Sequence, residues 1–253
     1  MMKTTRSRVA FAELSAAVLL ATLPVSAHAA CREMLHDAQT HTVCEVTSDQ
    51  DLRLFLTDPD GTVLGSFARI DAQLAAEGGS LGFAMNAGMY HADRRPVGLY
   101  IEKGIELAPL VTAAGPGNFG LRPNGVFCIR TDGRFAVVES RAFRDRAPDC
   151  RHATQSGPML VINGALHPRF LPDSDSRHVR NGVGVSADGT RAVFAMSRGR
   201  VNFHEFARLF RDALGLPQAL YFDGNISRLH APAIGRSDFG FPMGPVVGLV
   251  VPN

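Results

Sequence analysis

A long hydrophobic run of the kind that anchors a protein in a membrane is missing from this sequence of 253 residues. The apolar segment at residues 16–25 is shorter than the roughly 20 residues that a membrane-spanning helix needs. A positively charged stretch precedes the segment, and Ala27-His28-Ala29 follows it with the small residues that signal peptidase accepts. Residues 1–29 are therefore predicted to be a cleavable signal peptide. The mature chain is expected to be periplasmic or secreted, without a transmembrane anchor.

An excess of charge of either sign is also missing once the predicted leader is removed. The whole sequence has 26 Lys and Arg against 24 Asp and Glu, and the leader holds three of the basic residues and one of the acidic ones. The remaining 23 residues of each sign offer no basic excess for a nucleic-acid-binding face, so no nucleic acid is expected as a partner. Residues 30–253 are numerous enough for one domain with a proper core, and no repeat or linker divides them.

Cysteine spacing typical of a structural zinc site is missing as well. The four cysteines, Cys31, Cys44, Cys128 and Cys150, form no Cys-x-x-Cys or Cys-x-x-His motif. An even number of cysteines in an exported protein favours disulfides. Three pairings are possible, and Cys31–Cys44 with Cys128–Cys150, which closes the shortest loops, is favoured. A lipid-modified Cys31 is the alternative, and His28 disfavours it because a lipobox has an apolar residue at that position.

Short strand-like runs dominate the remainder of the sequence. Apolar segments bounded by turn residues predict strands at residues 43–46, 52–56, 81–85, 97–101, 126–129, 135–138, 159–162, 183–185, 192–196, 219–222 and 246–250. Asp132-Gly133 and Asp188-Gly189 separate neighbouring runs closely enough to predict hairpins. Much of the sheet is therefore expected to be antiparallel.

Helical patterns are few. Residues 202–214 begin with Asn202 as N-cap and Glu205 as its capping partner, and Gly215 and Pro217 end the pattern. Residues 67–76 show a second, less regular apolar stripe that ends at glycines. Together with the strands, these helices predict an α+β fold. We expect a single domain over residues 30–253, with a largely antiparallel or mixed β-sheet core and a few packed helices.

Two common hydrolase motifs are missing too. Ser156 lacks the Gly-x-Ser-x-Gly turn of serine hydrolases, so a serine triad is disfavoured. His204-Glu205 lacks the second histidine of a zinc-binding His-Glu-x-x-His helix, and helix capping explains this pair better. His91 and Asp93 could contact a metal, but a surface loop is the simpler interpretation.

The sequence does contain small polar residues at the points where apolar strands begin or end. Asp223 follows the run at 219–222, and similar groups flank other runs. These groups are Gly224, Asn225 and Ser227; Asn86-Ala87-Gly88 with Tyr90; Asn124-Gly125; Gln155-Ser156-Gly157; and Arg177, His178, Arg180 and Asn181. Glycine lets a backbone come close to a ligand, and a guanidinium grips an oxyanion through two N–H groups. Each motif alone is typical of a simple turn.

Taken in order, the stretches "MNAGMY…PVGLYIEKG", "ATQSGPMLV", "RNGVGVS" and "VNFHEFARLFRDALGLPQALYFDGNIS" resemble the phosphodiester glycosidase domain family. This family, once a domain of unknown function, includes relatives of the mannose 6-phosphate uncovering enzyme. The resemblance is strongest over residues 81–250. Within the family, the sequence is similar to the small periplasmic branch that is found in bacteria. The sequence departs from the family twice, with Asn86-Ala87-Gly88-Met89 for Asn-Gly-Gly-Phe and Asp223-Gly224-Asn225-Ile226-Ser227 for Asp-Gly-Gly-Gly-Ser.

The resemblance implies an exported hydrolase that acts on a glycosyl phosphodiester, that is a sugar 1-phosphate diester, or on a related envelope phosphodiester. Asp223, Arg180 and Asn86 are the predicted catalytic residues. Arg180 and the backbone N–H groups around Gly224 and Gly157 would hold the phosphate, while Asp223 would stabilise positive charge on the sugar or activate water. The predicted substrate-binding residues are Gln155, Ser156, Gly157, Asn124, Gly224, Asn225, Ser227 and Tyr90. The partner would be a small-molecule or glycan phosphodiester, and no cofactor is predicted.

Two other functions remain open at this stage. A non-catalytic periplasmic protein that binds sugar phosphates or glycans would use the same pocket, and the two lost glycines would mark lapsed catalysis. A metal-dependent phosphodiesterase would use Asp223, Asn225 and His91 as metal ligands.

Overall fold

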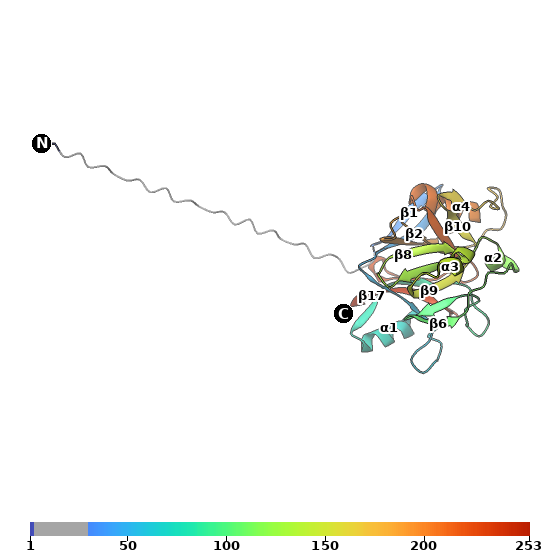
Figure 1. Ribbon diagram of the computed structural model, residues 1–253, viewed down its shortest axis with the longest axis horizontal. Coiled ribbons are helices and arrows are strands. Elements are labelled where there is room, and N and C mark those ends of the chain that lie inside the picture. Colours follow the sequence, from blue (N-terminus) through green and yellow to red (C-terminus); the bar gives the residue numbers. More distant parts are fainter. Residues whose placement is uncertain (3–29) are drawn as a thin grey trace.

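The computed structural model describes residues 1–2 and 30–253 (Figure 1). The predicted signal peptide, residues 1–29, lies outside the described residues apart from its first two. The described chain is mostly β-structure, with the strands in three sheets and every pair of neighbouring strands in this part of the chain antiparallel. This confirms the predicted α+β class with a largely antiparallel core.

The first sheet is the largest and carries α4 and η1 on its outer face. Its seven strands lie in the order β1 (Ala30–His36), β2 (Gln39–Thr47), β13 (Arg191–Ser197), β12 (Asn181–Val185), β14 (Gln218–Asp223), β10 (Met159–Ile162) and β11 (Ala165–Leu166). Phe206 of α4 (Phe203–Arg208) and Phe210 of η1 (Leu209–Ala213) join Val43 and Val193 in one buried cluster. The hairpin predicted at Asp188-Gly189 is confirmed, because it connects the antiparallel strands β12 and β13.

The second sheet packs against α1. Its strand order is β16 (Arg236–Ser237), β15 (Leu229–Ala231), β4 (Gly79–Asn86), β17 (Val246–Pro252) and β3 (Asp51–Phe55), with η2 (Pro232–Ile234) between β15 and β16. Ile70 and Leu74 of α1 (Phe67–Ala76) pack with Leu81 and Ala84 of β4. Figure 1 shows α1 at one end of the domain and α4 at the other, with the sheets between them.

The third sheet contains β6 (Ile105–Ala108), β5 (Tyr100–Glu102), β9 (Cys150–Ser156), β7 (Gly125–Arg130) and β8 (Phe135–Glu139) in that order. Helix α3 (Ser140–Arg146) places Phe143 against Val126 and Cys128. The short helix α2 (Gly117–Gly120) lies in the loop before β7. The hairpin predicted at Asp132-Gly133 joins β7 and β8 and is also confirmed.

Aromatic side chains from all three sheets meet in one core. Phe194 of the first sheet lies 5.1 Å from Phe83 of the second and 5.7 Å from Phe127 of the third, measured between ring centroids. Phe222 of β14 completes the group at 6.3 Å from Phe127. Since each ring removes a large apolar area from water, this cluster ties the three sheets into one body. It also fixes the end of β14, from which Asp223 emerges.

Two predicted elements differ in the structure, and other elements were not predicted. The helix predicted at 202–214 has the expected Asn202–Glu205 capping box, but its second half, η1, is a π-helix. The strand predicted at 97–101 begins only at Tyr100, because the N–H of Val97 donates to the carbonyl of Met89 in the preceding loop and that of Leu99 donates to the Gln155 side chain. Helix α3 and strand β9 were not predicted, and both are short or polar in composition.

Both favoured disulfides are present. Cys31 pairs with Cys44 across β1 and β2, and Cys128 pairs with Cys150. The bond to Cys44 occupies the sulfur that lipid modification of Cys31 would require. Two disulfides fit a location outside the cytoplasm. Among the described residues, no helix has the length and apolar character that crossing a membrane requires.

Candidate active site

Several of the predicted polar strand ends lie together where hydrogen bonds join the three sheets. Ser156 Oγ at the end of β9 donates to the carbonyl of Phe222 in β14 at 2.8 Å. Thr154 Oγ1 of β9 donates to the carbonyl of Ala87 after β4 at 2.6 Å. Asn181 Nδ2 of β12 donates to Asn86 Oδ1 of β4 at 2.7 Å. These side chains are buried, and their hydrogen bonds form a polar seam. Loss of one partner would leave a buried polar group unpaired, which costs free energy.

The seam holds the turn at residues 223–228. The backbone N–H of Asp223 donates to Asn181 Oδ1 at 3.0 Å, and that of Arg228 donates to Asn86 Oδ1 at 2.9 Å. Asn86 Nδ2 donates in turn to the carbonyl of Ile226. Ser227 Oγ bonds to the carbonyls of Val179 and Asp223. Two buried asparagines thus fix both ends of the turn that presents Asp223.

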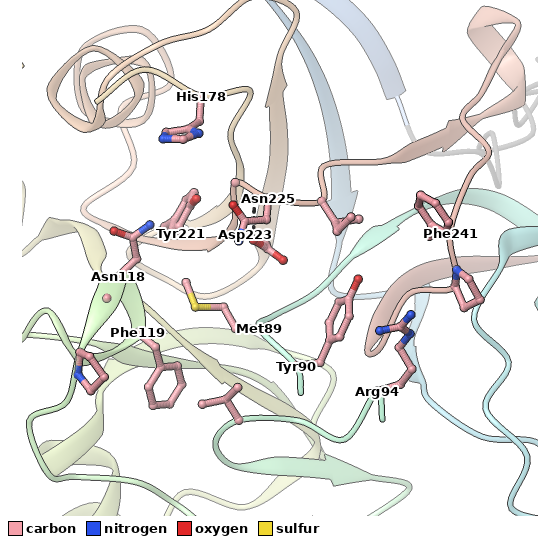
Figure 2. Close-up of a pocket in the computed structure, with 16 residues that line it drawn as sticks. Met89, Tyr90, Arg94, Asn118, Phe119, His178, Tyr221, Asp223, Asn225 and Phe241 are labelled. Atoms are coloured by element: carbon pink, nitrogen blue, oxygen red, sulfur yellow. Dashed lines mark hydrogen bonds between the residues drawn. The ribbon is translucent and has the colours of Figure 1, made fainter. Parts of the chain in front are cut away.

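A cavity of about 750 Å³ opens at this turn. Figure 2 shows Asp223 and Asn225 near its centre, with Tyr221, His178 and Asn118 on one side and Tyr90, Arg94 and Phe241 on the other. Its volume is in the range of small-molecule binding sites. Within the described part of the chain, Asp223 is the only carboxylate among the residues that line it.

The Asp223 carboxyl is 8% exposed, and burial raises its pKa above the ordinary value. Hydrogen bonds from the backbone N–H groups of Asn225, Gly224 and Ile226 oppose this shift. The N–H of Asn225 donates to Asp223 Oδ1 at 2.9 Å, the bond that Figure 2 draws as a dashed line. The turn therefore turns its amides toward the carboxylate. This differs from the expectation that the N–H of Gly224 would hold a phosphate.

Tyr221 forms the cavity wall next to Asp223, because residues two apart on a strand share a face. A side chain at Gly224 would collide with the Tyr221 hydroxyl, so only glycine fits where the turn crosses this ring. Burial raises the pKa of Tyr221, and the nearby Arg180 charge lowers it again. The phenol therefore stays protonated, which makes its hydroxyl a hydrogen-bond donor.

Arg180 lies behind Tyr221 rather than in the cavity. Its side chain is fully buried, with Nε donating to the carbonyl of Val201 at 2.9 Å and Nη2 to that of Ser176 at 2.8 Å. The guanidinium carbon lies 3.6 Å from the centre of the Phe203 ring and 5.4 Å from that of Tyr221. Nη1 is buried without a well-formed hydrogen bond to any described residue. The structure thus brings Arg180 to the site but not to the surface that a substrate touches.

On the opposite side, Tyr90 lies between Asp223 and Arg94 (Figure 2). Burial raises the pKa of Tyr90, and the Asp223 charge raises it further, while the charges of Arg94 and Arg228 lower it. The Arg94 guanidinium carbon lies 5.5 Å from the centre of the Tyr90 ring. A cation and a hydroxyl therefore face the carboxylate across the cavity.

The predicted site residues fall into two groups. Asp223, Gly224, Asn225 and Tyr90 line the cavity. The others lie behind its wall, where the side chains of all but Gly157 hydrogen-bond to the chain itself. These are Asn86, Asn124, Gln155, Ser156, Gly157, Arg180 and Ser227. The predicted convergence of distant strand ends is therefore present, and most of the converging side chains support the site from within.

The family model for phosphodiester glycosidase matches residues 80–230, more than half of the sequence. The chain belongs to the phosphodiester glycosidase family. Among curated proteins, the uncharacterized protein YigE of Escherichia coli strain K12 is 36% identical over 215 residues, which cover 83% of this chain and 82% of YigE. The predicted resemblance is confirmed.

Two solved structures share the fold of this phosphodiester glycosidase family member. The catalytic domain of zebrafish N-acetylglucosamine-1-phosphodiester alpha-N-acetylglucosaminidase, auto-inhibited by its pro-peptide, matches with a TM-score of 0.59 and 13% identity. The match covers 88% of this chain and 82% of that domain. A Burkholderia pseudomallei protein described as exported matches with a TM-score of 0.53 and 12% identity, over 83% of this chain and 74% of the other. These likenesses show the fold.

Several cavity residues of this phosphodiester glycosidase domain were not singled out from the sequence. Tyr221 could have been found from its parity, because it alternates with the core residues Leu220 and Phe222 and shares a face with Asp223. Arg94 and Phe241 come from loops, and Asn118 and Phe119 from the four-residue helix α2 within a loop, with no pattern that marks a site. Loop residues that face a cavity are set by tertiary packing, which no local signal reports.

The ligand set of the metal-dependent alternative is not assembled in one place. Asp223 and Asn225 line the cavity, but His91 does not. In residues 1–2 and 30–253, no group of three or more His, Cys, Asp or Glu side chains is close enough together to hold an ion.

Proposed function

We propose that this chain hydrolyses a glycosyl phosphodiester in the cavity beside Asp223, and that it does so outside the cytoplasm, as a periplasmic or secreted enzyme. The observation that carries the proposal is that Asp223 supplies the single carboxylate of the cavity in the described chain, while the other polar side chains of its partly apolar lining are cationic, imidazole, hydroxyl and amide groups. Most glycosidases need two carboxyl groups, one of them to protonate a poor leaving group. A phosphate monoester leaves without strong acid help, so one carboxylate is enough for this substrate class.

In the proposed reaction, the bond between the anomeric carbon and the phosphate oxygen breaks, and its electron pair leaves with the phosphate monoester. Water adds to the anomeric carbon and gives one proton to Asp223, from which it passes to solvent. The negative carboxylate also stabilises positive charge on the sugar ring. Arg94 and the hydroxyls of Tyr90 and Tyr221 would hold the phosphate oxygens, and Arg180 would act through Tyr221.

Hydrolysis in ¹⁸O-labelled water tests which bond breaks. We expect the label in the released sugar, because the proposed attack is at carbon, and none in the phosphate monoester. Mass spectrometry of both products measures this directly. Label in the phosphate product would instead assign attack at phosphorus, and the proposed role of Asp223 at the anomeric carbon would be wrong.

The pH dependence of kcat/KM tests the charge state of Asp223. Burial raises the carboxyl pKa, and the proposed base must be ionised. We therefore expect activity to fall as the pH decreases, with an acidic limb above the ordinary value of 3.8. Repeating the profile with His178→Gln separates the limb of Asp223 from any contribution of that exposed histidine. Activity that increases down to pH values below 3.8 would show that the carboxyl acts in its protonated form.

A further inference from the structure

A second cavity of about 530 Å³ adjoins the first and shares Arg94 and Pro242 with it. The loop at residues 240–242 separates the two, with Gly240 on the wall of the second and Phe241 on the wall of the first. Phe241 is 80% exposed, so this loop forms an open partition rather than a buried wall. The two hollows therefore lie on either side of one arginine.

Arg94 is held at this junction by its own loop. Its backbone has a φ of 73°, a left-handed conformation that is uncommon for residues other than glycine. Its N–H donates to the carbonyl of His91 at 2.8 Å, and its Nη1 donates to the carbonyl of Ala92 at 3.0 Å. Ion pairs in the described chain engage the neighbouring Arg95 with Asp93, but none engages Arg94. A positioned guanidinium without a carboxylate partner is able to bind a phosphate through its N–H groups.

We propose that the second cavity binds the alcohol half of the diester, with Arg94 on the phosphate that links this half to the glycosyl half beside Asp223. The proposal rests on the proposed function, because it assigns a place to the group that leaves with the phosphate. It follows from the geometry of a diester, in which the phosphate carries one organic group on each side. One shared cation between two cavities matches that arrangement.

The lining of the second cavity indicates the chemistry of its occupant. Val63, Leu64, Ala92 and Pro242 offer apolar surface, and the hydroxyls of Thr62 and Ser66 lie among them. The Arg69 guanidinium also lines the cavity and is tied to the carbonyl of Val63 at 2.9 Å. Apolar walls with a few fixed polar groups suit a molecule that has both apolar C–H faces and hydroxyl groups. We therefore assign a second sugar unit to this cavity.

Binding of phosphate monoesters tests the proposal without any turnover. Glucose 6-phosphate carries a sugar as its alcohol part, whereas methyl phosphate has the same phosphate with almost no alcohol part. By isothermal titration calorimetry, we expect the wild-type chain to bind glucose 6-phosphate about tenfold or more tightly than methyl phosphate. Equal affinities for the two compounds would overturn the proposal, whether or not the chain hydrolyses a diester.

Substitutions that fill the second cavity locate the binding difference. Ala92→Trp and Thr62→Trp place a bulky ring from two separate loops, and both residues are exposed, so the fold tolerates the change. Each variant is expected to bring glucose 6-phosphate to within about twofold of methyl phosphate while methyl phosphate binding persists. Ala187→Trp, on the exposed turn between β12 and β13, is the matched control and should keep the wild-type difference.

The outcomes separate this proposal from the proposed function. If both tryptophan variants keep the full preference for glucose 6-phosphate, the alcohol half binds elsewhere and the proposal is wrong. If they lose both ligands equally, Arg94 has moved and the second cavity has no separate role. If the wild-type chain shows the preference but hydrolyses no glycosyl phosphodiester, the binding site stands and the proposed reaction fails.

Discussion

Replacement of Asp223 by asparagine is expected to lower kcat for a sugar 1-phosphate diester by about 10²-fold or more, with a small effect on KM. Asparagine keeps the size of the side chain and a carbonyl oxygen for the N–H of Asn225. It removes the negative charge and the site that accepts a proton from water. Because no second carboxylate lines the cavity in the described chain, no neighbouring acid can replace it. A sugar 1-(p-nitrophenyl phosphate) diester provides the measurement. Cleavage at the anomeric carbon releases p-nitrophenyl phosphate, which added alkaline phosphatase converts to the absorbing p-nitrophenolate.

The stability of the same variant distinguishes chemistry from folding. A carboxyl whose pKa is raised in the folded state binds its proton more tightly there than in the unfolded chain. At pH values above that raised pKa, the ionised carboxylate therefore lowers the free energy of unfolding, whereas a neutral asparagine side chain does not. We expect Asp223→Asn to have a thermal midpoint at neutral pH no lower than that of the wild type. A variant that loses activity together with stability would assign Asp223 a structural role.

A matched control is available in Asp71, whose Oδ1 accepts the N–H of Leu81 at 2.7 Å on the face of α1. Asp71→Asn keeps that acceptor and lies on α1, which packs against the second sheet, outside the cavity lining. Its activity should stay within about twofold of the wild type, as for a typical surface substitution. Tight binding of the diester by both wild type and Asp223→Asn with no turnover by either would instead favour the non-catalytic binding protein.

Most strands of this domain could be predicted, because their apolar residues are bounded by turn dipeptides. β9 is the informative exception, since its buried residues include His152, Thr154, Gln155 and Ser156. These side chains have hydrogen-bond partners elsewhere in the chain, in β14 for Ser156, just after β4 for Thr154, and in loops or α3 for the others. A segment that is buried therefore has the composition of a loop. Periodicity detects burial in apolar surroundings and not burial in a polar seam.

The site shows the same limit in another form. The sequence predicted that strand ends carrying Asp223, Asn86 and Ser156 would meet, and in the structure they do. Which of these side chains would face the cavity depends on how three sheets are rotated against one another. A buried asparagine that fixes a loop and one that binds a ligand have the same local sequence, so Asn86 could not be assigned its supporting position in advance.

Arg180→Met is expected to lower kcat by about 10²-fold although Arg180 does not reach the cavity. The buried guanidinium forms no ion pair with a described carboxylate, so its charge is balanced only by two carbonyls and the faces of Phe203 and Tyr221. An uncompensated buried charge is costly and is retained where it has a use. We infer that this use is to strengthen the Tyr221 hydroxyl as a donor to the phosphate.

Unfolding is not expected to explain the loss in Arg180→Met. Exchange of a buried charge for an apolar side chain of similar volume is often neutral or stabilising. The carbonyl of Val201 also keeps the N–H of His178 as a second donor. Arg177→Met is the matched control, because Arg177 lies three positions before Arg180 in the sequence and its guanidinium is fully paired with the Glu205 carboxylate. That variant should retain most of the activity, with thermal melts confirming that both variants are folded.

A double-mutant cycle with Tyr221→Phe decides whether the two residues act as one unit. If Arg180 acts through the Tyr221 hydroxyl, Arg180→Met should not lower kcat any further in a chain that already lacks that hydroxyl. We therefore expect Tyr221→Phe and the double variant to have the same kcat within about twofold, although each single change alone costs about 10²-fold. Losses that multiply would show that Arg180 contributes to the site by a route that does not include Tyr221. A conservative Arg180→Lys variant should recover part of the rate only if the positive charge, rather than the packing of the guanidinium on Phe203, supports the phenol.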